Sequence, residues 1–159
     1  MSSTAPFNEA AFAEWHKAQQ TQVADYLRQL EVYDTDITGE WLWIIPHRAM
    51  LGRVRAKEGD GPILWMITGV VPTDHAEAAA ASNCREAARY FSLKWQMEAA
   101  RLEKGTDTTA KPSEGVDWKQ ASGNIAGRAE WLHDLTENPR LWNQDGSPVR
   151  RIDQESAQI

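Results

Sequence analysis

The spacing of apolar and polar residues predicts three amphipathic helices. Apolar residues recur with a helical period over residues 8–30, where Asn8 is suited to capping the first turn. The same period returns over residues 83–104. A third helix is expected to begin near Trp118 and to end before Pro139, because proline cannot continue a helix.

Between the first two helices the pattern becomes that of β-strands. A first strand is expected at residues 41–45, between Gly39 and Pro46, and a second at residues 50–57 with one solvated face. The almost wholly apolar run 63–71 predicts a central strand covered on both sides. Three consecutive strands with short connections indicate an antiparallel meander.

These elements predict an α+β domain of two layers, in which a three-stranded antiparallel meander packs against about three amphipathic helices. The domain is expected to span residues 8–142, with a flexible N-terminal tail at residues 1–7 and a mobile C-terminal tail at residues 143–159. Trp142 is expected to dock back onto the core. A chain of 159 residues can bury about 70% of its unfolded surface, so it needs no disulfide or structural metal to fold.

The charge of the chain restricts its partners. The formal net charge is −6, which argues against binding to nucleic acid or to an anionic membrane. The first residues lack the pattern of a signal peptide, no apolar stretch reaches the ~20 residues of a membrane helix, and Cys84 is the single cysteine. The expected location is therefore the cytoplasm.

One segment has a recognisable motif. Its residues are Trp65-x-Ile67-x-Gly69-x-x-Pro72-Thr73-Asp74, then Arg85-Glu86-Ala87-x-x-x-Phe91, then Lys94-Trp95-Gln96. This segment resembles an uncharacterised bacterial family of small cytosolic proteins, described as a domain of unknown function, and the resemblance extends from about residue 12 to residue 142. It implies a shared fold and assigns no activity and no functional residues. His47-Arg48-Ala49-Met50 departs from the aromatic pattern of the family's first strands, so a binding face there would differ.

The segment Thr73-Asp74-His75 has the most reactive-looking side chains. It leaves the central strand and leads toward a helix N-terminus, where backbone N–H groups attract anions. Arg85 in the first turn of that helix could hold a carboxylate or phosphate. The structural alternative is that Asp74 caps the connection or pairs with Arg85.

Cys84 is a weak candidate for a nucleophile. A thiol at a helix N-terminus can have a lowered pKa, and His75 and Asp74 could act as base and orienting group. However, Cys84 lies on the apolar face of its helix, and the adjacent Asp74 and His75 side chains should diverge. A small core residue is the favoured interpretation. No histidine has metal-binding spacing, and neither a metal nor a cofactor is expected.

His47 and Arg48 follow the first strand, and with Arg53 and Arg55 they could form a basic patch on the sheet. The alternative is an ordinary solvated strand pair with matched charges.

Tryptophan is abundant, with eight residues that could lie in the core or serve as binding hot spots. Trp41 and Trp43 have the same parity, so both are expected on one sheet face. The residues on helical apolar stripes are expected in the core: Trp15, Trp95 and Trp131. Trp118 and Trp142 could be surface anchors.

Three functions agree with these features. The favoured one is a non-enzymatic protein-interaction module, such as an adaptor, inhibitor or immunity-type protein, for which a basic partner protein suits the negative charge. The alternative is a small enzyme or small-molecule binder that recognises an anionic ligand near Thr73–Arg85. Self-association through a sheet edge or through the helix face that carries Gly123 and Gly127 is compatible with both. A deep pocket beside Asp74, His75 and Arg85 would favour the second, and a flat apolar patch with exposed tryptophan the first.

Overall fold

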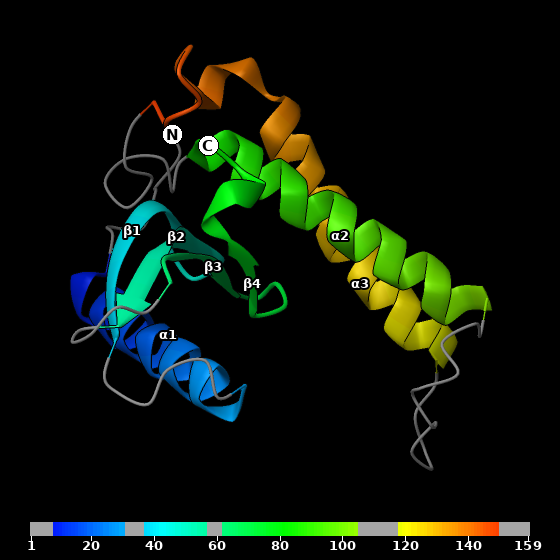
Figure 1. The fold of residues 1–159 in the computed structure, drawn as a ribbon, viewed down its shortest axis with the longest axis horizontal. Helices are drawn as coiled ribbons and strands as arrows, with labels where there is room; N and C mark the ends of the chain where they lie inside the picture. Colours follow the sequence, from blue (N-terminus) through cyan, green and yellow to red (C-terminus); the bar gives the residue numbers. More distant parts are fainter. Residues whose placement is uncertain (1–7, 31–36, 57–61, 105–117, 150–159) are drawn as a thin grey trace, which may run out of the picture.

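Three long helices and a four-stranded sheet make up the described part of the chain, which in this computed structural model comprises residues 8–30, 37–56, 62–104 and 118–149 (Figure 1). The helices are α1 (Glu9–Gln29), α2 (Cys84–Lys104) and α3 (Trp118–Glu137). The strands are β1 (Ile37–Ile45), β2 (Ala49–Ala56), β3 (Leu64–Gly69) and β4 (Asp74–Glu77). The α+β class and the three predicted helices are confirmed.

The sheet has the order β1-β2-β3-β4, with every pair antiparallel. The prediction of three strands is therefore wrong by one. The segment Asp74–Glu77 is short and polar and carries no strand pattern, but it pairs with β3 from Ile67↔Asp74 to Leu64↔Glu77. This pairing places β4 at one edge of the sheet.

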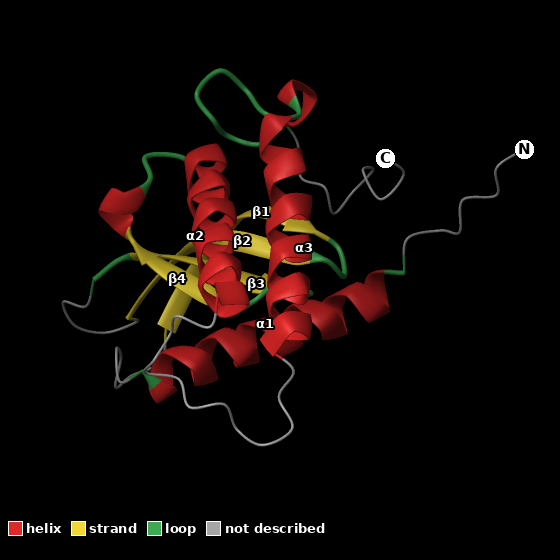
Figure 2. Ribbon diagram, turned by 90° about the vertical axis from the view of Figure 1, so that its right-hand side faces the viewer, coloured by secondary structure: helices red, strands yellow, loops and turns green. Residues whose placement is uncertain are grey.

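Helices cover both faces of the sheet, so the domain has three layers and not the predicted two. Figures 1 and 2 show α1 on one side of the strands and the α2–α3 pair on the other. Val23 and Leu27 of α1 pack with Val54, Leu64 and Met66. The opposite face contains a larger cluster with these residues at its centre: Trp43, Leu51, Trp65, Ile67, Phe91, Trp95 and Leu132. The prediction that the third strand is covered on both sides is confirmed.

A β-bulge separates Trp41 from Trp43. The two residues pair with Gly52 and Leu51, which are consecutive on β2, so Leu42 is the extra residue of the bulge. Trp43 is buried in the α2–α3 core, whereas Trp41 packs on the α1 side. The prediction that both rings lie on one sheet face is wrong, because the bulge changes the alternation of side chains.

The turn between β1 and β2 is tied to the end of β3. Arg48 N–H donates to Ile45 O at 2.9 Å, and His47 takes a positive φ of 63° at the third position of this turn. The carbonyl of Arg48 accepts from Val70 N–H at 2.8 Å. Gly69, whose φ is 136°, lies directly against that carbonyl. This crowding requires glycine.

The chain after α3 returns to the core. Trp142 is buried, its ring lies 4.9 Å from that of Trp43, and its Nε1 donates to Leu135 O at 2.9 Å. Trp142 therefore docks on the core, as predicted, and is not a surface anchor. Residues 143–149 form a turn in which Gly146 O accepts from Arg85 N–H at 3.0 Å, and the rest of the predicted tail lies outside the described residues.

The other tryptophans differ in burial. Trp95 is fully buried, as predicted, but Trp15 and Trp131 are only half-buried. Trp15 lies beside the His47 ring at 5.6 Å, and the side chain of Trp118 lies outside the described residues. None of the described helices is both long enough and apolar enough to cross a membrane.

Candidate functional site

Asp74 joins the edge strand β4 to helix α2. Its carboxylate accepts from Lys94 Nζ at 2.8 Å and from Trp95 Nε1 at 3.0 Å, and it also accepts from the backbone N–H of His75 at 2.8 Å. Asp74 and Trp95 are buried. The structural interpretation of Asp74 is thus favoured, but its partners are Lys94 and Trp95 and not the predicted Arg85.

His75 points to the opposite face of the sheet, as alternation along a strand requires. It pairs across the strands with Met66, on the α1 side, and its Nδ1 lies 2.8 Å from the Tyr26 hydroxyl. Burial, and then the nearby Asp74, raise the pKa of Tyr26 to about 12, so its hydroxyl stays protonated at neutral pH. The Tyr26 hydroxyl also donates to Asp74 Oδ1 at 3.5 Å, so it lies between the two candidate side chains, and a role of Asp74 and His75 as acid and base stays a prediction.

Thr73 belongs to a small polar network beneath α1. Its hydroxyl lies 2.9 Å from that of Thr68 and accepts from Gln22 Nε2. Thr68 in turn donates to Gln19 Oε1 at 2.9 Å and is fully buried. The hydroxyl groups of both threonines are engaged in holding the first helix against the end of β3.

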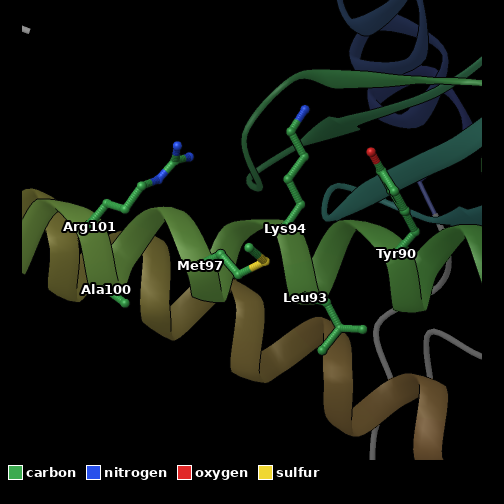
Figure 3. A pocket seen from close by; sticks show the side chains of 6 residues that line it. All are labelled: Tyr90, Leu93, Lys94, Met97, Ala100 and Arg101. Carbon is green, nitrogen blue, oxygen red and sulfur yellow. The ribbon is translucent and has the colours of Figure 1, made fainter. Parts of the chain in front are cut away.

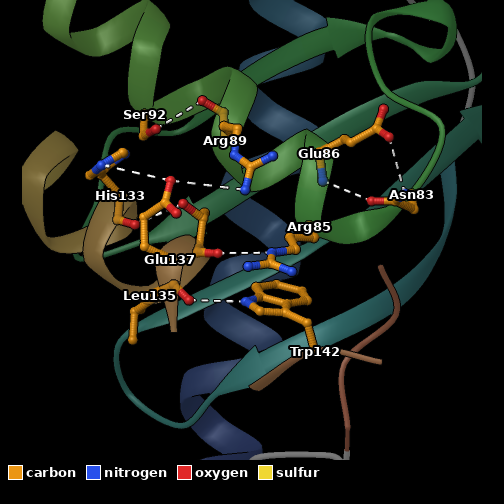
Figure 4. Close-up of polar contacts among 10 residues, drawn as sticks. Asn83, Arg85, Glu86, Arg89, Ser92, His133, Leu135, Glu137 and Trp142 are labelled. Carbon is orange, nitrogen blue, oxygen red and sulfur yellow. Dashed lines mark hydrogen bonds and ion pairs between the residues drawn. The ribbon is translucent and has the colours of Figure 1, made fainter. Parts of the chain in front are cut away.

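Arg85 stabilises the end of α3 (Figure 4). Its Nε donates to Thr136 O at 2.8 Å, in the last turn of that helix, where a cation is favourable. The first N–H groups of α2 are also used, since Glu86 N–H donates to Asn83 Oδ1 at 2.8 Å and Arg85 N–H to Gly146 O. Two of the N–H groups expected to attract an anion at this N-terminus therefore bond to acceptors of the protein itself.

Cys84 is a buried core residue. Burial raises the pKa of its thiol to about 12, which opposes the lowered pKa that a nucleophile would need. The geometry agrees with the core interpretation and does not place His75 or Asp74 beside the sulfur as a catalytic pair.

The raised pKa of Cys84 predicts a loss of stability at alkaline pH. The unfolded thiol releases its proton near pH 9 and the folded one only near pH 12, so the free energy of unfolding should hold below pH 9 and fall as pH rises toward 12. Tyr26 acts in the same direction above pH 10. Urea unfolding at about pH 8 and about pH 10 measures the loss, which should be smaller in Cys84→Ala. Rapid labelling of the folded thiol at neutral pH would contradict its burial.

The four basic residues predicted as one patch lie at opposite ends of β2. His47 and Arg48 precede the strand and Arg55 lies near its other end, so Arg48 and Arg55 are separated by about 23 Å at 3.3 Å per residue. Arg53 lies over the Trp65 ring at 5.4 Å and pairs across the strands with Glu40. This agrees with the alternative of a solvated strand pair with matched charges. A role for these residues, or for the Thr73–Arg85 segment, in binding stays a prediction.

Metal ligands do not gather in the described part of the chain. No group of three or more histidine, cysteine, aspartate or glutamate side chains there lies close enough together to hold a metal ion.

An apolar stripe on the outside of α2 was missed. Tyr90, Leu93 and Met97 have exposed fractions of 38, 49 and 68%, and Ala100 follows on the same side of the helix. These side chains, with Lys94 and Arg101, line a groove of about 550 Å³ (Figure 3). We name this surface the α2 groove. The sequence carries a signal for it, because residues 90, 93, 97 and 100 have the alternating three- and four-residue spacing of a helix-packing seam.

Comparisons with known proteins address the family and not the activity. Residues 9–142 match the model of a family described as Domain of unknown function (DUF4826). Searches of curated proteins and of solved structures gave no significant match. Since the matched residues cover most of the 159-residue chain, the protein belongs to this family, and the expectation of an uncharacterised family is confirmed.

Proposed function

We propose that this protein is a cytoplasmic, non-enzymatic interaction module that binds a partner protein through the α2 groove. The observation that carries the proposal is the exposure of Tyr90, Leu93 and Met97 on one face of a helix whose opposite face is buried. A helix needs only one apolar face to pack on its own domain. A second apolar face has a cost in water that binding would remove.

The side chains of the groove suit protein recognition. Tyrosine is enriched among the residues that dominate binding energy, and methionine adapts its shape to irregular partner surfaces. Lys94 is held by Asp74, so one wall of the groove is already ordered before a partner arrives. Such preorganisation lowers the entropy lost on binding.

The alternative, an anionic ligand near Thr73–Arg85, has less support. Thr73 bonds to Gln22 of α1, Asp74 bonds to Lys94 of α2, and Arg85 joins α2 to α3. A ligand there would have to break these bonds. A partner in the α2 groove requires no such rearrangement.

The test is a pull-down from native lysate with tagged wild-type protein and with the double variant Leu93→Gln/Met97→Gln. A protein bound in stoichiometric amount by the wild type should be lost from the double variant, because two apolar contacts are removed without adding charge. Leu30→Gln is the matched control, since Leu30 is 46% exposed but lies at the end of α1. Equal recovery with all three proteins would refute the α2 groove as the binding surface.

A further inference from the structure

The α2 groove has a charge that differs from that of the whole chain. The net charge of the protein is −6, yet among the described residues the charged side chains that line the groove are Lys94 and Arg101. Figure 3 shows both on the same side of the helix as Tyr90, whereas Leu93 and Ala100 point toward the α3 side. The groove is therefore apolar along its floor and basic along one rim.

From this charge, and resting on the proposed function, we propose that the groove binds an amphipathic helix of a partner protein with aspartate or glutamate beside its apolar stripe. This differs from the basic partner that the net charge alone suggested. The local charge decides which partner surface can approach, because charges across an interface act over about a Debye length.

The spacing of the apolar residues favours a helix as the occupant. Tyr90 and Met97 are seven residues apart, and so are Leu93 and Ala100, as in the a and d positions of a heptad. The stripe is about 15 Å long at 1.5 Å per residue, which matches about three turns of a partner helix. The large Tyr90 at one end and the small Ala100 at the other make the groove uneven, so a partner with residues of different size would fit best.

A second copy of this chain fits the groove less well. In a heptad whose a positions are Tyr90 and Met97, Lys94 and Arg101 take the e positions and Arg89 a g position. In an antiparallel pairing centred on the stripe, e positions face e positions, so Lys94 of one copy would lie opposite Lys94 of the other. A parallel pairing would bring Arg89 beside Lys94. Like charges meet in both arrangements, whereas acidic side chains on a different helix would be attracted.

Arg101 is the cation whose charge the experiment reverses. Arg101 is exposed and lines the groove directly. Reversing its charge should change the preferred partner without removing any apolar contact surface.

The experiment uses two synthetic helices of about 18 residues with leucine at the a and d positions, one with glutamate and the other with lysine at the flanking positions. Fluorescence anisotropy with the full-length protein should show roughly tenfold tighter binding of the acidic peptide at low salt, with the difference shrinking as salt rises. Arg101→Glu should abolish or reverse the preference. Arg55→Glu, which makes the same change of charge on β2, should keep it.

The outcomes separate this inference from the proposed function. Equal affinity for both peptides, lost in Leu93→Gln/Met97→Gln, would overturn the acidic partner and leave the α2 groove as a binding surface. Failure to bind either peptide would overturn the helical partner, while the pull-down would still decide the proposed function. If sedimentation shows a homodimer, and Met97→Gln dissociates that homodimer, the acidic helical partner would be overturned and the occupant of the groove would be a second copy of the chain.

Discussion

Gly69→Ala is expected to destabilise the protein by about 3 kcal/mol or more. A Cβ atom at this position would lie 2.1 Å from Arg48 O and 2.8 Å from Ala49 Cα, and both of these are backbone atoms that belong to the sheet. The φ of 136° is also a conformation that residues with a side chain rarely adopt. Relief requires the turn before β2 to move away from the end of β3, which would weaken the pairing of the two strands.

Gly127→Ala is the matched control, and the expected change has the opposite sign. Gly127 lies within α3, and a Cβ there would meet nothing within 4 Å. Alanine is favoured over glycine inside a helix by about 1 kcal/mol. Thermal unfolding followed by circular dichroism should therefore show a lower melting temperature for Gly69→Ala, by about 6–12 °C, and a slightly higher one for Gly127→Ala. Equal effects of the two substitutions would contradict the close contact at Gly69.

The helices were predictable because their apolar residues repeat with the period of an α-helix, which differs from that of a strand. Asn8 caps α1 through a 2.9 Å bond from Ala11 N–H to its Oδ1, in agreement with its sequence position. β3 was predictable for a related reason, since a continuous apolar run of strand length requires cover on both faces. The sequence pattern does not show which helix covers which face of the sheet. For this reason the predicted number of layers was wrong.

The fourth strand could not be recognised from its own residues. Asp74-His75-Ala76-Glu77 has no β-branched or aromatic residue, and its strand conformation comes from pairing with β3. The same pairing positions the candidate site residues. It directs Asp74 toward Lys94 and Trp95 of α2 and His75 toward α1, and the Tyr26 hydroxyl of α1 contacts both side chains.

The tryptophan prediction failed for a local reason. Strict alternation assigns Trp41 and Trp43 to one face, but a single extra residue in β1 moves them to two different cores. The second apolar stripe of α2 was present in the sequence as residues 90, 93, 97 and 100. This second stripe was overlooked because the larger stripe through Phe91 and Trp95 was already sufficient to predict the helix and its buried face.

Two of the polar residues that looked reactive hold the domain together, because Asp74 joins the sheet to α2 and Arg85 joins α2 to α3. The α2 groove, by contrast, exposes apolar side chains. Since buried hydrogen-bonded groups and exposed apolar groups have opposite effects on stability, the two roles can be separated by experiment. Loss of the former should lower stability, whereas loss of the latter should affect binding alone.

Asp74→Ala is accordingly expected to destabilise the protein by about 2–4 kcal/mol and to lower its melting temperature by about 5–15 °C. The substitution leaves the indole N–H of the fully buried Trp95 without its acceptor and removes the ion pair with Lys94. It also frees the backbone N–H of His75. Asp74→Asn should have a smaller effect than Asp74→Ala, because the amide keeps one oxygen that can accept hydrogen bonds. Some loss remains, because the amide NH2 takes the place of the other oxygen and faces donor groups.

Glu77→Ala is the control for this prediction, since Glu77 is an exposed carboxylate on the same strand. It should leave the melting temperature almost unchanged. In Asp74→Ala protein that remains folded, Lys94 loses its compensating charge, so the α2 groove becomes more positive and should bind the acidic peptide more tightly than the wild type does. A melting temperature equal to that of the wild type, together with lost partner binding, would instead make Asp74 a binding residue, and the anionic-ligand alternative would then regain support.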